Sequence, residues 1–206
     1  MIPTDTEQRQ PLNPLRGKSR EFAIYVFNNF HYAHSNPAGK THYMFFDSVF
    51  FAFSIPANKN ISGFLLGEPK SVWELSRMWA ADGHERNALT KSLKKSIARF
   101  KELEPAAKAL VSYADPNVGH AGFVYRAASW VSMGQSEEGR YYVDGEGQVV
   151  SRRKFHSGGS SMKKAEILSL GYQELKLPGK IRYAKGLTRY ARNKINQKAS
   201  ALRVGS

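Results

Sequence analysis

The sequence contains no cysteine among its 206 residues, which excludes disulfide bonds, thiolate nucleophiles and cysteine-ligated metal centres. No stretch approaches the roughly 20 consecutive apolar residues of a membrane-spanning helix, so we expect no membrane partner. The opening segment, MIPTDTEQRQPLNPLRGKSRE, lacks the apolar core of a signal peptide, and we expect residues 1–20 to form a flexible polar arm. These absences fit a protein of a reducing cytoplasm.

Acidic residues are scarce relative to basic ones, 17 against 31, and the net charge is +14. A field of this sign attracts polyanions, of which nucleic acid is the first candidate. The imbalance is strongest from Leu175 to Ser206, where there is no Asp or Glu. Four basic residues there follow helical spacing, and we expect one face of a helix to present them to DNA: Arg182, Lys185, Arg189 and Arg192.

Two tyrosines, Tyr183 and Tyr190, lie among these basic residues, and either could stack on an exposed base. The alternative interpretation is that residues 184–206 form a solvated, frayed basic tail that only aids solubility. The charge favours DNA contact over the inert tail.

Strand-like and helix-like patterns alternate through the middle of the chain. They predict a single domain over residues 21–183, of α/β or α+β class, with a mixed sheet. Consecutive strand–helix–strand units predict right-handed parallel crossovers. The predicted strands are 22–30, 43–55, 72–79 and 108–114, then SMGQS and RYYVDGEGQVV; the predicted helices are 88–103, 120–131 and MKKAEILSLGY.

The strand VWELSRMW raises a question of charge burial. Its alternation places four residues on one face: Trp73, Leu75, Arg77 and Trp79. The guanidinium of Arg77 should therefore be partly buried, and a buried charge needs a partner. Asp115, at the end of the expected neighbouring strand, is within reach. Such a pair could serve a site, or it could only fix the sheet.

The start of the helix ALTKSLKKSIARFKEL is a candidate anion site. Free N–H groups and the positive end of the helix dipole bind phosphate, and Asn87 is a credible N-cap. Arg86 would add a charge-assisted contact and Thr90 a hydroxyl. No G-x-x-x-x-G-K-S/T or G-x-G-x-x-G run precedes the helix, which argues against ATP and dinucleotides. An ordinary capped turn is the alternative.

The stretch LVSYADPNVGHAGFVYRAASW places a carboxylate where a buried strand ends and a phenol in the following helix. Ligand sites of α/β sheets lie at the carboxyl ends of strands, so Asp115 could accept a proton from an amine or orient it. Tyr125 could reach the same cleft and protonate a leaving group. The alternatives are a turn cap for Asp115 and a packed aromatic with a solvated hydroxyl for Tyr125. Trp130 and the loop around His31 are candidate walls of the cleft.

The six histidines do not show the spacing of a metal site. His31, His34 and His42 lie in or beside one loop, and an acid or base role for one of them is favoured over a closed metal cage. We therefore predict no metal-binding residues from the spacing.

Three segments, ELSRMW, ERNALTKSL and VSYADPNVGHAGFVYRAASW, resemble the bacteriophage Mom DNA-modification proteins, which are placed on the Gcn5-related N-acetyltransferase (GNAT) fold. HY at 31–32 and LPGKIRY at 177–183 are similar to flanking segments of that family, so the resemblance spans residues 31–183. It implies a GNAT-like α+β fold with a mixed, mostly antiparallel twisted sheet and helices on both faces.

The resemblance implies a transferase that acts on double-stranded DNA in the cytoplasm of the bacterial host. The implied reaction adds a small acyl-derived, carbamoylmethyl-like group to the exocyclic amine of adenine, which protects phage DNA from host restriction. Acetyl-CoA or a related acyl donor is the implied cofactor, and iron is a further cofactor associated with the family.

Residue by residue, the resemblance assigns catalysis to three positions and cofactor binding to five. The catalytic positions are Asp115, Tyr125 and His31, with His34 as a competitor for the loop histidine. The cofactor-binding positions are Arg77, Arg86, Asn87, Thr90 and Ser112. The chain departs from the family pattern where RNALT replaces RNSES, and it lacks the Q/R-x-x-G-x-G/A loop of ordinary GNAT acetyltransferases. We therefore expect an altered contact with the donor.

Two other functions fit the same features. One is an N-acetyltransferase that acts on a protein or small-molecule amine, which the positive charge disfavours because amine substrates are cations. The other is a basic nucleic-acid-binding protein without catalytic activity.

Overall fold

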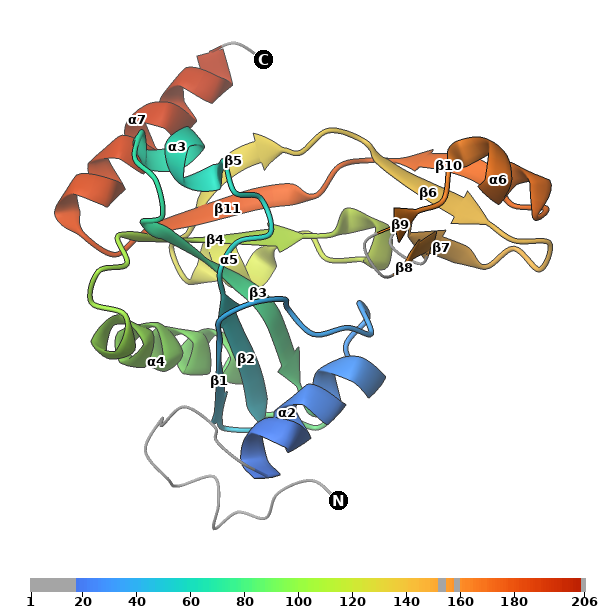
Figure 1. Cartoon of the computed structure of the whole chain (residues 1–206). Coiled ribbons are helices and arrows are strands. Elements are labelled where there is room, and N and C mark those ends of the chain that lie inside the picture. Colours follow the sequence, from blue (N-terminus) through green and yellow to red (C-terminus); the bar gives the residue numbers. More distant parts are fainter. Residues whose placement is uncertain (1–17, 152–154, 158–159, 205–206) are drawn as a thin grey trace.

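The computed structural model describes residues 18–151, 155–157 and 160–204. Within these ranges the chain forms a six-stranded sheet, a three-stranded sheet and a two-stranded hairpin, and helices cover both faces of the largest sheet (Figure 1). Most of the expected N-terminal arm, residues 1–20, lies outside the described residues.

The six-stranded sheet has the order β1-β2-β3-β4-β11-β5. Its neighbouring strands are antiparallel except for β3 and β4, which are parallel and are joined through a helix, as the sequence predicts. A mostly antiparallel sheet with packed helices confirms the α+β class. The strands are β1 (Thr41–Phe46), β2 (Val49–Ser54), β3 (Val72–Ala80), β4 (Ala109–Ala114), β5 (Val131–Gln135) and β11 (Ile181–Gly186).

Alternating side chains of the strands determine which helix covers which face. On β2, Phe51 and Phe53 pack into the core that contains α4, whereas Phe50 and Ala52 pack against α2. Val72 packs with α3 and α7, whereas the next residue of β3, Trp73, packs into the α4 core. Because successive side chains of a strand point to opposite faces, α3 and α7 lie on the side of the sheet opposite α4, which is also the side of α2. We call the two sides the α4 face, with α4 (Ala88–Leu103) and α5 (Phe123–Ala127), and the α7 face, with α2 (Lys18–Asn29), α3 (Ile61–Leu66) and α7 (Arg189–Val204).

The predicted strand at 22–30 is wrong, because these residues form most of helix α2. Their β-branched and aromatic content suggested a strand. Ala23, Val26 and Phe27 are nevertheless buried together, at the i, i+3, i+4 spacing of a helix face. Burial of this stripe against the sheet outweighs the strand propensity of the individual residues.

The predicted strand at 43–55 is two strands, β1 and β2, which form a hairpin. The turn consists of Asp47 and Ser48, which both have positive φ, 48° and 65°. Positive φ at both central residues is the geometry of a two-residue hairpin turn whose twist matches that of its strands. The predicted run is too long for one strand because it contains this turn.

The helix predicted at 120–131 is shorter than expected. A 3₁₀ turn, Pro116–Val118, follows β4, and α5 covers only Phe123–Ala127. Ser129 ends the helical stretch with a positive φ of 58°, which a helix cannot continue through. The helices predicted at 88–103 and within MKKAEILSLGY are confirmed, the second as α6 (Lys164–Ser169).

The C-terminal segment is packed against the sheet. Strand β11 runs through the expected boundary at residue 184 and pairs with β4 and β5. In α7, Ala191, Ile195 and Ala199 are buried at a spacing of four residues against the sheet and α3. The structure therefore does not support a frayed tail over these residues. None of the described helices is long and apolar enough to span a membrane.

The three-stranded sheet projects from the edge of the main sheet as an arm (Figure 1). Two of its strands are continuous with strands of the main sheet, because β5 leads into β6 and β10 leads into β11 after three residues each. The arm contains β6 (Gly139–Val143), β7 (Val149–Ser151) and β10 (Gln173–Leu177), and the hairpin beside it contains β8 (His156–Ser157) and β9 (Ser160–Ser161).

Gly122 precedes α5 in a space that admits no side chain. Its φ is +75°, and a Cβ placed there would lie 2.3 Å from Cε2 of the Tyr183 ring. The same ring anchors the loop, since its hydroxyl donates to the carbonyl of Ala121 at 3.1 Å. Gly119 has a similar φ of +78°, but a Cβ at this position would have nothing within 4 Å.

We predict that Gly122→Ala lowers the free energy of unfolding by about 3 kcal/mol, because backbone strain adds to a clash with a buried ring. Gly119→Ala is the matched control and should cost about 1 kcal/mol, from the backbone strain alone. Urea unfolding followed by circular dichroism measures both. Equal losses in the two variants would show that the contact with Tyr183 does not constrain this loop.

Candidate functional site

The parallel strands β3 and β4 separate after three paired residues. Pairing joins Val72 to Ala109, Trp73 to Leu110 and Glu74 to Val111, and no further pairs follow. Beyond this point a pocket of about 900 Å³ lies in the gap between the two strands. The gap opens at the carboxyl ends of the parallel pair, where the sequence predicts a site.

A bulge in β3 changes the direction of its side chains at the gap. The register with β2 shifts between Ala52 and Phe53, so that the strand gains one residue at Ser76. Leu75 therefore packs into the α4-side core, whereas Trp79 packs with the aromatic residues around α2. The prediction of one common face for Trp73, Leu75, Arg77 and Trp79 is wrong for this reason.

The pocket is lined from both faces of the sheet, because it passes through the gap. The α7 face contributes residues of the loop after α2, of the segment before α3 and of the strands: Phe30, His31, Tyr32, Asn58, Arg77 and Tyr113. The α4 face contributes residues of the loop before α4 and of the α5 region: His84, Leu89, Ser112, His120, Phe123 and Tyr125. Residues where the arm joins the main sheet complete the wall, among them Ser136 and Lys180.

Tyr125 is a buried residue of the pocket wall, and its hydroxyl belongs to a short chain of hydrogen bonds. Ser112 Oγ lies 2.7 Å from the carbonyl oxygen of Leu75 and 2.7 Å from Tyr125 Oη. Since a carbonyl only accepts, the serine proton goes to Leu75 and the phenol donates its proton to Ser112. Burial raises the pKa of Tyr125 to about 12, so the phenol keeps its proton at neutral pH.

Two further aromatic rings fix the position of Tyr125. Tyr183 stacks on it with ring centres 5.1 Å apart, and the Trp130 ring lies 5.3 Å away. Tyr183 is only 2% exposed, so the expectation that it stacks on a DNA base is wrong. Trp130 is buried in the core and does not line the pocket, which corrects its predicted role as a wall.

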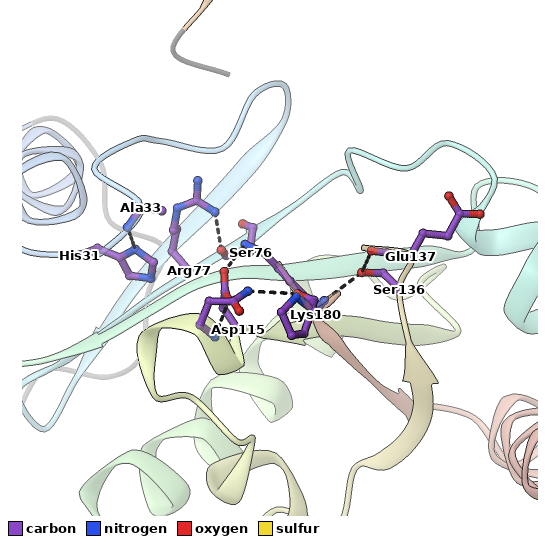
Figure 2. Close-up of polar contacts among 10 residues, drawn as sticks. His31, Ala33, Ser76, Arg77, Asp115, Ser136, Glu137 and Lys180 are labelled. Carbon is purple, nitrogen blue, oxygen red and sulfur yellow. Dashed lines mark hydrogen bonds and ion pairs between the residues drawn. The ribbon is translucent and has the colours of Figure 1, made fainter. Parts of the chain in front are cut away.

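Asp115 caps the turn that follows β4, which is the structural alternative that the sequence left open. Its Oδ1 accepts from the backbone N–H of Asn117 at 3.1 Å and from the side-chain Nδ2 at 3.0 Å, as a turn cap does. Its Oδ2 lies 3.0 Å from the Lys180 ammonium. The carboxylate itself does not line the pocket, but it holds Lys180, which does. In the view of Figure 2, Asp115 lies between the His31–Arg77 side and Lys180.

His31 is buried beside the pocket in a neutral form. Its Nδ1 accepts from the backbone N–H of Ala33 at 3.1 Å, so the ring proton resides on Nε2. Burial, with the nearby Arg77 guanidinium as the next contribution, lowers the pKa of His31 to about 3. His34, the competing loop histidine, is exposed and does not line the pocket. The structure thus brings His31, and not His34, to the site.

Tyr32 connects the two faces of the pocket. Its ring stacks on His31 at 4.4 Å and meets the His120 ring at 5.2 Å across the gap, with the Lys180 ammonium 5.9 Å from its centre. Burial, together with the Asp115 carboxylate, raises the pKa of the Tyr32 phenol. Sequence reasoning did not assign Tyr32, His120 or Lys180 to the site, because three separate loops bring them together. In the sequence, the HY and LPGKIRY segments could have indicated Tyr32 and Lys180, because both segments are similar to flanking segments of the family that the chain resembles.

Arg77 lies in the pocket wall, but Asp115 is not the group that holds it. Its Nε and one terminal nitrogen donate to the carbonyl and hydroxyl of Ser35, each at 2.9 Å, and the other terminal nitrogen donates to the carbonyl of Ser76 at 2.6 Å. The expected ion pair with Asp115 is wrong because the bulge turns Arg77 toward the loop after α2, while Asp115 pairs with Lys180.

The start of α4 lies near the pocket, and only part of its first-turn N–H groups is available to a ligand, because those of Ala88 and Lys91 donate to backbone carbonyls. Asn87 occupies the N-cap position with a positive φ of 66°, and its side chain caps no N–H group, which corrects its predicted capping role. Arg86 and Asn87 are exposed and Thr90 is half-buried. The pocket lining reaches this region through His84 and Leu89 instead. The three assigned residues are therefore beside the pocket and not within its wall.

The four predicted DNA-binding residues do not share a helix face. Arg182 and Lys185 lie on β11 and point to opposite faces of the sheet, whereas Arg189 and Arg192 are exposed on α7. Lys185 donates to the carbonyl of Ala128 at 2.6 Å, and burial lowers the pKa of its ammonium group. The spacing of the four basic residues gave a wrong prediction of one helix face, because Arg182 and Lys185 lie in a strand and only the other two lie in a helix.

Within the described ranges, no group of three or more His, Cys, Asp or Glu side chains is arranged to hold a metal ion.

The fold and the pocket define an α+β protein whose central sheet separates around a buried phenol. The family model of the Mom protein family matches residues 16–202, and the chain belongs to this family. A segment of 77 residues is 32% identical to the protein named methylcarbamoylase mom of Escherichia phage Mu, which is 37% of this chain and 32% of that protein. The aligned segment thus covers about a third of the length of this relative.

The lowered pKa of His31 predicts a pH dependence of stability. The unfolded chain binds a proton on this histidine below about pH 6.5, whereas the folded state does so only near pH 3. The stability of the fold should therefore fall as the pH drops through this window. Between pH 7 and pH 5 we expect the wild type to lose about 1 to 2 kcal/mol more than His31→Asn, which keeps an acceptor for the Ala33 N–H.

Urea unfolding at the two pH values tests the difference. NMR of the imidazole nitrogens gives an independent result, with His31 remaining in the Nε2–H form at pH 5. A ring signal that titrates near pH 6 would contradict the assignment.

Proposed function

We propose that this protein is a DNA adenine modification enzyme that adds a small acyl-derived, carbamoylmethyl-like group to the exocyclic amine of adenine. In an infected bacterial cell the modification would protect phage DNA from host restriction. Membership of the Mom family and the name of the phage Mu relative, methylcarbamoylase, support this class of reaction. The observation that carries the proposal is the protonated Tyr125 phenol in the gap between β3 and β4.

Tyr125 is suited to act as an acid. Because its pKa is raised to about 12, the phenol is protonated at neutral pH; it therefore cannot act as a base toward an amine, but it holds a proton that it can give to a basic leaving group. Its hydrogen bond to Ser112 fixes the direction of the hydroxyl. When the phenol gives its proton to a leaving group, the proton that the amine loses on modification can pass to the phenolate, so that the phenol is restored.

His31 and the Lys180–Asp115 pair are suited to position the acceptor. Because its Nδ1 is taken by Ala33, His31 can offer an N–H donor and not a base. Lys180 brings a positive charge to the pocket wall, and Asp115 holds it there. We therefore propose general acid catalysis for Tyr125 and positioning roles for His31 and Asp115.

An acyl-CoA or related donor fits the α4 side of the pocket. A bound donor would supply the carbon group that is transferred. The N–H groups of Leu89 and Thr90 in the first turn of α4, which the Asn87 side chain leaves uncapped, can donate to its phosphates, with Arg86 beside them. Among the ion pairs of the described residues, none involves Arg86, so its charge is available to such an anion.

The proposal is tested by mass spectrometry of nucleosides from the DNA of bacteria that produce the protein. We predict an adenine nucleoside of increased mass with the wild type and at least about a hundredfold less of it with Tyr125→Phe, because the proton donor is lost. Tyr43→Phe is the matched control, since Tyr43 is also buried and does not line the pocket. It should retain the modification.

Absence of modified adenine with soluble wild-type protein, in a host that supports a known Mom protein, would refute the proposed acceptor. Full modification by Tyr125→Phe would refute only the role of the phenol.

Attraction of DNA phosphates is the second part of the proposal. The exposed residues Arg189 and Arg192 lie on α7, a helix without acidic residues. We predict that Arg189→Glu combined with Arg192→Glu weakens binding to a duplex about tenfold or more and reduces the slope of log K against log salt by about 2.

The control is Lys94→Glu combined with Lys101→Glu, which makes the same charge change on exposed residues of α4. Fluorescence anisotropy of a labelled duplex at several salt concentrations measures both pairs. Equal effects would show that only net charge matters, and the α7 surface would lose its assigned role.

A further inference from the structure

The pocket has two rims, and each rim carries one exposed phenylalanine. Phe30, on the α7 face, is 56% exposed, and Phe123, on the α4 face, is 70% exposed; both line the pocket. Because the pocket passes through the gap in the sheet, a donor and an acceptor can enter it from opposite faces. The two rims differ in the groups that they offer to a donor and to an acceptor.

The α4 rim is suited to the donor. It includes His84 and Leu89 at the start of α4, where the N–H groups are left uncapped. A phosphate-bearing molecule that binds at this helix end would extend into the pocket past Leu89. The acceptor then has to enter from the α7 rim.

The α7 rim carries a connected series of aromatic rings. The Phe30 ring lies 5.7 Å from Trp79, which also lines the pocket, and 5.9 Å from Tyr25. Tyr25 in turn stacks on Phe22 at 6.3 Å. Tyr25 is 52% exposed, so exposed apolar surface continues from the rim along α2. Exposed aromatic rings next to a pocket are stacking surfaces for unpaired bases.

Positive charge on the same face complements DNA. The Arg182 guanidinium lies 4.7 Å from the Phe64 ring centre, and the partner of Arg182 on β4, Tyr113, lines the pocket. The Lys198 ammonium lies 4.1 Å from the same ring centre. Helix α7, which carries no acidic residue, covers this face as well. Phosphates bound here would bring a duplex to the α7 rim.

We propose that DNA approaches the α7 face and that the extruded adenine enters the pocket by stacking on Phe30. The inference rests on the proposed function, because it concerns the acceptor of that reaction. An adenine amine inside a duplex is accessible to such a pocket only when the base leaves the stack. Phe30 would provide the first surface that replaces the lost stacking.

The test measures base extrusion separately from modification. Duplexes with one 2-aminopurine in place of adenine, in all sixteen combinations of flanking bases, are bound by the full-length protein without a donor. The fluorescence of 2-aminopurine rises when it leaves the stack. We expect a rise with the wild type in at least one context and a rise about tenfold smaller with Phe30→Ala. Phe30→Trp should bind the base and quench it, because indole rings quench a stacked 2-aminopurine.

Phe123→Ala is the comparison that identifies the rim. If it abolishes the rise and Phe30→Ala does not, or if both variants lose it equally, the inference is overturned. Val118→Ala, an exposed apolar residue outside the pocket lining, controls for loss of surface hydrophobicity and should behave as the wild type. Thermal unfolding confirms that Phe30→Ala is folded.

Two further measurements separate this inference from its alternatives. Light scattering tests whether the aromatic surface pairs two copies of the chain; a dimer that Phe30→Ala dissociates would overturn the inference. Nucleoside mass spectrometry tests the proposed function itself. If the wild type modifies adenine and Phe30→Ala modifies it equally, the function stands and this inference fails. If the wild type extrudes 2-aminopurine and Phe30→Ala does not, but the wild type modifies no adenine, the inference about Phe30 stands and the proposed function fails.

Discussion

A side-chain hydrogen bond marks the place where the sheet opens, and the site depends on it. After Glu74 and Val111 the backbones of β3 and β4 no longer pair, yet Ser112 Oγ still bonds to the carbonyl of Leu75. This bond satisfies a backbone acceptor that would otherwise be left unpaired in the core. It also occupies the serine proton, so the phenol of Tyr125 must donate to Ser112. The opening of the sheet and the protonation of the candidate acid are therefore parts of one arrangement.

The bulge in β3 determines what surrounds that opening. It sends Arg77 to the loop after α2, where the carbonyl and hydroxyl of Ser35 accept two of its N–H groups, and it leaves Lys180 as the partner of Asp115. The low pKa of His31 follows from burial beside this guanidinium. The pocket thus combines a neutral imidazole, a protonated phenol and a held ammonium group. This set suits an acceptor that is itself uncharged, such as the amine of a nucleobase.

Much of the central sheet could be predicted, because β3, α4 and β4 each carry a single clear period and lie in a parallel unit that the sequence indicates. The positions of Asp115 at the end of β4 and of Tyr125 in the next helix could be predicted for the same reason. The bulge at Ser76 could not be predicted from alternation, which assumes an unbroken pleat. Nor could the pairing of Lys180 with Asp115, since residues so far apart in sequence meet only through the order of the strands. In α2, the high strand propensity of the side chains outweighed, in the prediction, the helical spacing of the buried residues Ala23, Val26 and Phe27.

The crossing between the arm and the main sheet has a mechanical consequence. The two three-residue links are hydrogen-bonded to each other, since Ser136 N–H donates to the carbonyl of Lys180 and Lys180 N–H donates to Ser136 Oγ, both at 2.9 Å. A Cβ at Gly179 would lie only 1.9 Å from the carbonyl oxygen of Ser136, so the links are also in close contact. Any swing of the arm must therefore carry Lys180 with it. A rotation of the arm about these links would therefore shift the positive charge in the pocket wall.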